Sequence, residues 1–248
     1  DPYSTVVALD LIGKPDVNDP PVIDSRQKIF INEMNVSITS DRQNVEIRYT
    51  LDGTNPSNKS LLISDAVSIT ETSLITAQNF RDGNPVSGTV KALFTMVTPS
   101  KAVEIDEAGK GLRYQYFEGS WDQLPEFDRL EELGSGLVSN IDISKRSQDN
   151  HFGFVFEGHI LIHEQGVYTF YTDSDDGSQL FIGGDLVVDN DGLHSMTEAS
   201  GSVALSAGYH PIRVTYFEKN GGNQLNVYLE SVKIRKRIIS DNFLFHKK

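Results

Sequence analysis

Short segments in which apolar and polar residues alternate, each followed by Gly, Asp or Asn, recur along most of this chain. Residues 45–51 alternate in this way and run into Asp52-Gly53. Such alternation is typical of a strand with one buried face. The same pattern predicts further strands at 67–69, 74–80, 89–96, 152–156, 167–172, 179–182, 186–188, 201–205, 211–217 and 224–230. Strands at intervals of about ten residues, joined by polar turns, predict an all-β protein built from sandwiches or barrels.

The helical signal is weak by comparison. Residues 124–133 begin with Leu124-Pro125 and carry several acidic residues, which makes them the main helical candidate. An irregular excursion from the sheet is an equally good interpretation. No apolar run reaches the roughly 18 residues that a membrane-spanning helix requires, so we expect no transmembrane segment.

Charge is divided unequally along the 248 residues, whose formal net charge is −13. Residues 21–98 hold 7 basic and 8 acidic side chains, whereas residues 111–238 hold 10 basic and 19 acidic ones. The acidity therefore belongs to a second domain, and it disfavours nucleic acid as a partner, because phosphate binding needs a basic face. The domains we expect are a connector at 1–20, a first β domain at 21–98, a linker at 99–110, a second β domain at 111–238 and a tail at 239–248.

Several classes of site are excluded by composition and motif. The chain has no cysteine, so it holds no disulfide, thiolate metal site or cysteine nucleophile. Nucleophile elbows, phosphate loops and dinucleotide fingerprints are absent from the sequence. Glycoside hydrolysis needs two carboxylates placed across a sugar, and none of the many acids stands in a recognisable catalytic motif. We expect this chain to be non-catalytic and, because it begins Asp1-Pro2-Tyr3, to be a piece of a longer protein.

The string YTLDGTNP at residues 49–56 lies in the first domain, and strand-like segments follow it at 67–69 and 74–80. Over residues 21–98 this pattern resembles the chitobiase/β-hexosaminidase C-terminal domain. The resemblance implies an immunoglobulin-like β-sandwich that accompanies carbohydrate-active enzymes and has no catalytic residues of its own.

The second domain carries GLRYQYFEGSW at 111–121, GVYTFYTDSDDGSQLFI at 166–182 and VVDNDG at 187–192. Later segments are AGYH at 207–210 and YFE at 216–218. In order and spacing these segments resemble the protective-antigen-type β-barrel shared by bacterial toxins, flocculin adhesins and inserted modules of glycosidases. The resemblance implies a β-barrel or sandwich from about 111 to 233.

Adjacent carboxylates occur in the loop SDDGS, where Asp175 and Asp176 precede a glycine. Oxygen ligands on a glycine-bearing loop suit Ca²⁺. In adhesins of the resembled family such a pair holds calcium, which in turn binds sugar hydroxyls, and a partner loop supplies an Asn. At that place this chain has Glu218, followed by Asn220 and Asn223. We therefore expect Asp175, Asp176 and Glu218 as metal ligands, and Asp175, Asp176, Asn220 and Asn223 as the carbohydrate-binding residues. The alternative is that the acid pair only caps turns by accepting backbone N–H groups.

Other candidates carry less information. The acidic run at 189–192 resembles the start of a calcium loop, but a hairpin turn explains it better. His159 and His163 would lie about 13 Å apart along a strand, too far to share one ion. Tyr114, Tyr116 and Trp121 could form a sugar platform, although the alternation of the two tyrosines favours core packing.

Together the two resemblances imply the non-catalytic accessory region of an exported glycoside hydrolase, most naturally a β-N-acetylhexosaminidase. Its partners would be glycans and an upstream catalytic domain of the same chain, and its location periplasmic, cell-surface or extracellular. Three alternatives stay open at this point: purely structural or docking modules without a ligand, a calcium-dependent cell-surface adhesin, and a chain that itself catalyses a reaction.

Overall fold

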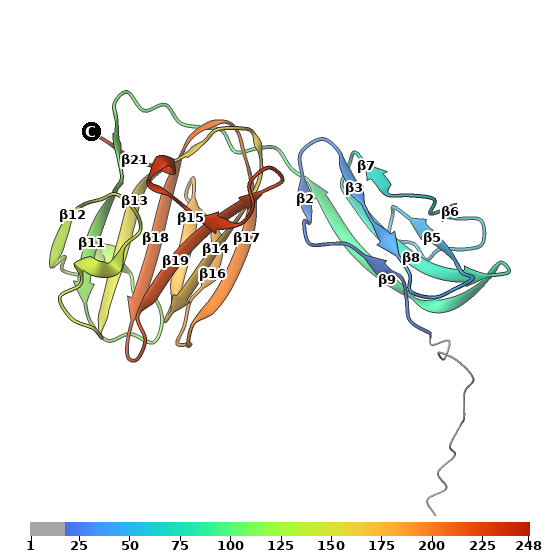
Figure 1. Ribbon diagram of the computed structural model, residues 1–248, viewed down its shortest axis with the longest axis horizontal. Coiled ribbons are helices and arrows are strands. Elements are labelled where there is room, and N and C mark those ends of the chain that lie inside the picture. The colour runs from blue at the N-terminus through green and yellow to red at the C-terminus, as the bar shows by residue number, and fades with distance from the viewer. Residues whose placement is uncertain (1–17) are drawn as a thin grey trace, which may run out of the picture. The chain divides into compact units, whose positions relative to one another are not determined.

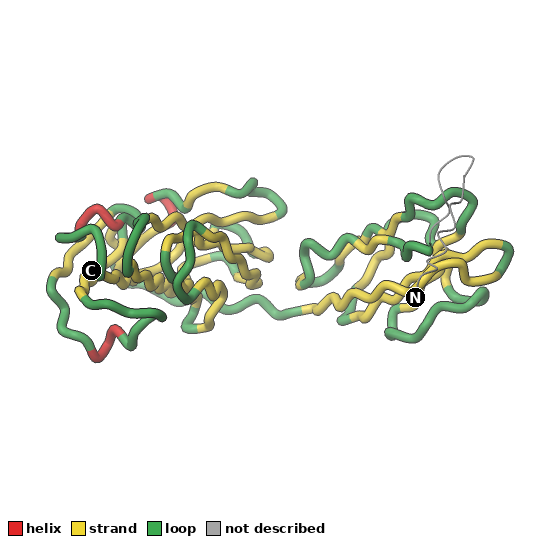
Figure 2. The backbone as a smooth tube through the Cα atoms, turned by 90° about the horizontal axis from the view of Figure 1, so that it is seen from below, coloured by secondary structure: helices red, strands yellow, loops and turns green. Residues whose placement is uncertain are grey.

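A computed structural model describes residues 18–248 of the protein. The chain divides into two compact units, with the change from the first to the second between Met96 and Val97 and with Ile29–Ile31 grouped with the second. Strands dominate both units, and the helices of the described residues are single 3₁₀ turns (Figures 1 and 2). The predicted all-β class is confirmed. The predicted connector 1–20 lies almost wholly outside the described residues.

The first unit contains short strands around one long hairpin. Strands β8 and β9 form this hairpin, which turns at Asp82-Gly83 with both residues at positive φ. The sheet built on it has the order β2-β9-β8-β5-β6, while β1 pairs with β4 and β3 pairs with β7. The strands are β1 Val22–Ile23, β2 Ile29–Phe30, β3 Met34–Val36, β4 Ile38–Thr39, β5 Glu46–Thr50, β6 Leu61–Leu62, β7 Val67–Ile69, β8 Ser73–Arg81 and β9 Asn84–Met96.

Alternation accounts for the core of this unit. Val67 and Ile69 of β7 are buried and the serine between them is exposed, as the sequence pattern predicts. On the long hairpin, Ile75 and Ala77 are fully buried. The first unit therefore supplies a rigid β scaffold.

The second unit consists of two sheets that enclose one core (Figure 1). The larger sheet has the order β10-β21-β13-β18-β15-β16, with β11 paired to β13 and β12 paired to β11. The smaller sheet has the order β17-β14-β19-β20. The strands are β10 Ala108–Lys110, β11 Leu112–Glu118, β12 Gly134–Val138, β13 Phe152–Ile162, β14 Gly166–Asp175, β15 Ser178–Ile182, β16 Asp185–Asn190, β17 Thr197–Leu205, β18 Gly208–Glu218, β19 Gln224–Ser231, β20 Arg237–Ile238 and β21 Leu244–Lys247.

Aromatic side chains fill this core. Phe152, Phe154 and Phe156 of the long central strand β13 are fully buried on one face, and Phe154 stacks on Phe156 at a centroid distance of 5.4 Å. Tyr116 packs against the same row, with 5.1 Å between its ring and that of Phe154. Each fully buried phenylalanine ring stabilises the folded state by roughly 1.5–3 kcal/mol.

The structure differs from the sequence-based boundaries at two places. Residues 239–248, predicted as a tail, include β21, which pairs with β10 and β13 and buries Leu244. Residues 99–110, predicted as a linker, include β10 and a bridge from Ser100 to Leu205. The strands within these segments, β10 and β21, are too short to show a sustained alternation. Their structure is therefore decided by pairing partners far along the chain.

The helical candidate at 124–133 contains one 3₁₀ turn, η1 Phe127–Arg129. Phe127 is buried against Phe117 and Val155 on the outer face of the larger sheet. The segment is therefore the irregular excursion that the sequence left open. The other 3₁₀ turns are η2 Ile143–Lys145 and η3 Asp241–Phe243. Within residues 18–248 no helix has the length and apolar character to cross a membrane.

Candidate functional site

The interior of the second unit changes from apolar to polar toward one end. Along β18 the inward row runs Ile212, Val214 and Tyr216, and it ends in Glu218, which is 0 % exposed. Because side chains alternate across a strand, the two-residue spacing places Glu218 on the core face. A buried carboxyl group at the end of an apolar row needs a compensating interaction.

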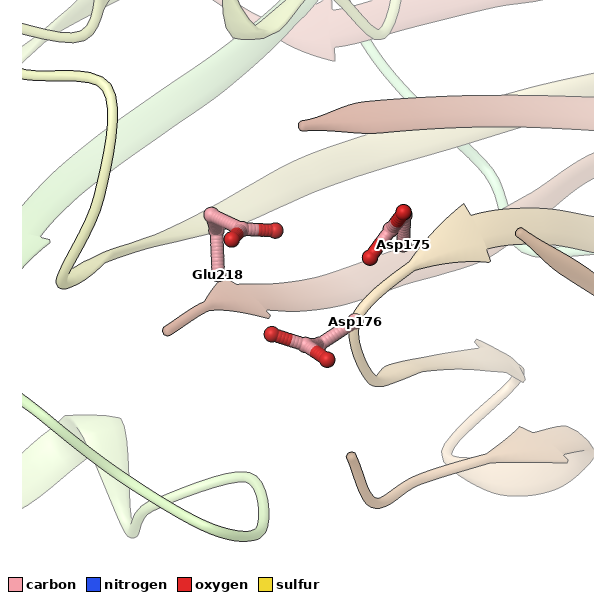
Figure 3. Close-up of side chains that lie close together, drawn as sticks. All are labelled: Asp175, Asp176 and Glu218. Carbon is pink, nitrogen blue, oxygen red and sulfur yellow. The ribbon is translucent and has the colours of Figure 1, made fainter. Parts of the chain in front are cut away.

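Three carboxylates meet at this end. Asp175 is the last residue of β14, Asp176 follows it through a cis peptide bond, and Glu218 is the last residue of β18. One carboxylate oxygen from each residue lies within 4.8 Å of the other two. Figure 3 shows the three side chains converging from the two strand ends. The structure thus brings together the three predicted metal ligands, which lie up to 43 positions apart in the sequence.

Asp176 is held firmly by the backbone. Its Oδ2 accepts the N–H of Lys219 at 2.9 Å, and its Oδ1 accepts the N–H of His194 at 3.1 Å. The side chain therefore ties the end of β18 to the loop between β16 and β17. The alternative offered by the sequence also has Asp accept backbone N–H groups, but these donors lie 18 and 43 positions away, outside the local turn. Each oxygen still has a lone pair for a cation.

Glu218 is the least satisfied member of the cluster. Its Oε1 is buried without a hydrogen-bond partner among the described residues, and its Oε2 is 3.5 Å from the Tyr216 hydroxyl. That hydroxyl donates a short hydrogen bond to the backbone oxygen of Asp175. A buried carboxylate oxygen without a partner costs free energy, and a cation between the three carboxylates would offset that cost.

The pKa values of two of the three carboxyl groups are raised. Burial raises the pKa of Glu218 to about 7, and the negative charges of Asp176 and Asp175 add to the shift. Burial also raises the pKa of Asp175, with the charge of Asp176 as the next cause. Like charges at this separation disfavour ionisation of Glu218 and Asp175. A bound divalent cation would reverse both effects, and the donor set, which is all oxygen, fits Ca²⁺.

The loop after β18 lies beside this cluster. A Cβ atom on Gly222 would stand 2.7 Å from Oδ2 of Asp175. Any other residue at this position would therefore displace that carboxylate. Asn220 is exposed, whereas Asn223 directs its amide nitrogen to the backbone oxygen of Asp149 at 3.2 Å. Of the two predicted sugar-binding asparagines, Asn223 therefore holds the loop to a neighbouring segment.

The acidic run at 189–192 has a supporting role. Asn190 is buried and donates to the Ser174 hydroxyl at 3.1 Å. Asp191 accepts the backbone N–H of Leu124 at 2.8 Å and that of Gly192 at 2.8 Å. These contacts link the excursion at 124–133 to the end of the unit that carries the carboxylates. Sequence reasoning missed this link, because nothing in the local pattern indicates a partner 67 residues away.

The remaining candidates are structural. Tyr116 is buried in the core and Trp121 packs against Phe127 at 6.0 Å, in agreement with the interpretation as core packing. His159 lies half-buried on β13 and His163 is exposed beyond its end.

Residues 111–242 match the PA14 domain family. This range covers more than half of the chain and includes the three carboxylates. The chain belongs to the PA14 domain family. The match covers the range for which the sequence predicts a protective-antigen-type barrel. Residues 36–94 match a second family, described as Fn3 associated.

Individual relatives are distant. A β-hexosaminidase from Porphyromonas gingivalis is 23 % identical over 196 residues, which are 75 % of this chain and 25 % of that enzyme. The chain thus spans about a quarter of the length of this curated relative. A solved anti-sigma factor domain-containing protein has a TM-score of 0.50 and 16 % identity, covering 86 % of this chain and 82 % of that one. The PA14 sugar-binding domain from an RTX adhesin has a TM-score of 0.47 and 18 % identity, covering 55 % of this chain and 98 % of that one.

Proposed function

We propose that the PA14 domain of this chain binds glycans through a calcium ion held by Asp175, Asp176 and Glu218. The observation that carries the proposal is the convergence of three carboxylates on a buried Glu218 oxygen without a partner. Membership of the PA14 family supports it, because the similar RTX adhesin domain is a sugar-binding member of that family.

The division of roles follows from the contacts. Asp176 is fixed by two backbone N–H groups and would orient the ion, while Asp175 and Glu218 would neutralise most of its charge. Calcium accepts six to eight oxygen ligands in flexible geometry, so when bound it offers positions to sugar hydroxyls. Asn220, exposed on the neighbouring loop, is the candidate for a direct hydrogen bond to the sugar.

For the chain as a whole, we infer an accessory, non-catalytic region of an exported glycoside hydrolase related to β-hexosaminidases. The similarity to the Porphyromonas gingivalis enzyme over both units supports this inference. In this proposal the first unit is a chitobiase C-terminal-like sandwich that acts as a spacer, and the second presents the glycan to an upstream catalytic domain. Loops carried on rigid β scaffolds suit such a role.

One observation favours a second candidate, a structural module without a ligand. Both oxygens of Asp176 already accept backbone N–H groups, one from His194 and one from Lys219. In this alternative, the carboxylates would hold the strand ends together and no sugar would bind.

A glycan array probed with millimolar calcium, and again with chelator, separates the two candidates. The calcium proposal predicts retained binding in calcium only, and loss of that binding in Asp175→Asn. Asp185→Asn is the matched control, because it neutralises one exposed carboxylate of the same domain. Absence of retained glycan in both conditions would favour the structural module. Hydrolysis of chromogenic hexosaminides by the chain would contradict the accessory role.

A further inference from the structure

A hollow lies on the outer face of the larger sheet, away from the carboxylates. It has a volume of about 250 Å³ and is lined mainly by Glu157, Phe181, Pro211 and Arg213, together with the glycines Gly158 and Gly184. Of the two glycines, Gly184 borders open space, since a Cβ atom there would meet nothing within 4 Å. Nothing in the proposed calcium site uses these residues.

Strand register places three of these residues in one row. Arg213 of β18 is directly opposite Glu157 of β13 on one side and Phe181 of β15 on the other. Residues directly opposite each other in a sheet present their side chains on the same face. A bulge opposite β16 falls between Leu180 and Phe181, and bulges commonly re-aim a side chain near a binding site.

Ion pairs fix the polar side chains of the hollow in the absence of a ligand. Arg213 donates to Glu157 at 2.6 Å and to Asp128 at 2.9 Å. Of its five N–H donors these ion pairs use two, and the carboxylates beside it add acceptor oxygens. About a third of the Arg213 side chain is exposed, 31 % by area. The two ion pairs therefore fix the orientation of the guanidinium group, and part of the side chain stays exposed to solvent.

The apolar part consists of the half-exposed Phe181 ring and Pro211. A flat apolar surface with donors and acceptors at its edge matches a pyranose ring, which has one apolar face and a rim of hydroxyl groups. The volume lies just below the roughly 300–1,000 Å³ of pockets for drug-sized ligands, and so suits a single ring.

We propose that this hollow binds one sugar residue without calcium, with the ring on Phe181 and the hydroxyls on Arg213 and Glu157. It is separate from the calcium site, since Arg213 lies five residues before Glu218 on β18, about 17 Å along the strand. The two residues also face opposite sides of the sheet. The domain would then contact a glycan chain at two places.

Saturation-transfer NMR on the full chain in excess chelator tests the proposal, with the methyl β-glycosides of glucose, galactose and N-acetylglucosamine as probes. We expect transfer to at least one probe at millimolar concentration, and a loss of about fivefold or more in Phe181→Ala, because a single ring gives little binding energy to spare. Val232→Ala, which shortens an exposed apolar side chain beyond the end of β19 in the smaller sheet, should keep the signal.

Further variants separate this site from the calcium site. Arg213→Gln should weaken transfer while the proton–nitrogen spectrum stays that of a folded chain, and Asp175→Asn should leave transfer unchanged. Absence of transfer to all three probes in the wild type would overturn the proposal. So would equal transfer in folded Phe181→Ala, whatever the outcome of the calcium experiments.

Discussion

Asp176 accepts the backbone N–H of Lys219 at 2.9 Å, and Lys219 is the residue that directly follows Glu218. One carboxylate therefore holds the strand end from which another carboxylate reaches the cluster. Asp175, by contrast, lies at the end of β14 and has a pKa raised by burial and by the charge of Asp176. The three acids, although close together, should respond differently to substitution.

Asp175→Asn and Asp176→Ala should affect stability in different ways. In chelator, Asp175→Asn should leave the melting temperature unchanged or raise it, because a repelling charge is removed. Asp176→Ala should lower the free energy of unfolding by about 1–3 kcal/mol, because the N–H groups of Lys219 and His194 lose their acceptor. Thermal unfolding with and without calcium checks both, and calcium should stabilise neither variant. Equal destabilisation by both changes would contradict this division of roles.

The pH dependence of stability should change sign when calcium is added. The pKa of Glu218 is raised to about 7 from an ordinary value of 4.5, so between these values the folded protein holds a proton that the unfolded chain releases. In chelator, stability from this group is therefore full below the unfolded pKa and is lost as pH rises through 7, by up to about 3 kcal/mol.

With calcium bound, the same proton competes with the ion, and stability should rise from pH 6 to pH 8. Melting curves at both pH values, with calcium and with chelator, measure the two slopes. Glu218→Gln should remove this contribution in both conditions. A wild type whose slopes have the same sign with and without calcium would be inconsistent with Glu218 as a ligand.

Gly222→Ala should weaken calcium binding without unfolding the domain. The new Cβ would stand 2.7 Å from Oδ2 of Asp175 and would push that carboxylate out of the cluster. Gly88→Ala is the control, because its Cβ would meet nothing within 4 Å. The calcium-induced shift in melting temperature should shrink in the first variant and stay at the wild-type value in the second. A full shift in Gly222→Ala would mean that Asp175 is not a ligand.

Strand positions were predictable where alternation was long. The predicted segment 45–51 contains β5, and the predicted 224–230 differs from β19 by one residue. Strands β10, β20 and β21 have only two to four residues each. Their local pattern cannot identify a strand, because the partner that pairs with them lies elsewhere in the chain.

The residues of the candidate site were predictable from the sequence, but their burial and hydrogen bonding were not. Adjacent acids on a glycine-bearing loop pointed to Asp175 and Asp176, and Glu218 came from the order of motifs. Burial of Glu218 without a partner for Oε1 depends on the inward row of β18 and on the opposing strand end. The backbone bonds of Asp176 likewise join segments 18 and 43 residues apart, which no local pattern reveals.

Calcium titration of the chelator-treated chain by isothermal calorimetry tests the central claim most directly. We predict one ion per wild-type chain at pH 8, with affinity lower by about tenfold or more in Glu218→Gln, since affinity in such sites follows the number of charged ligands. Absence of binding heat in the wild type, or equal affinity in folded Glu218→Gln, would contradict the claim that these three carboxylates hold a calcium ion.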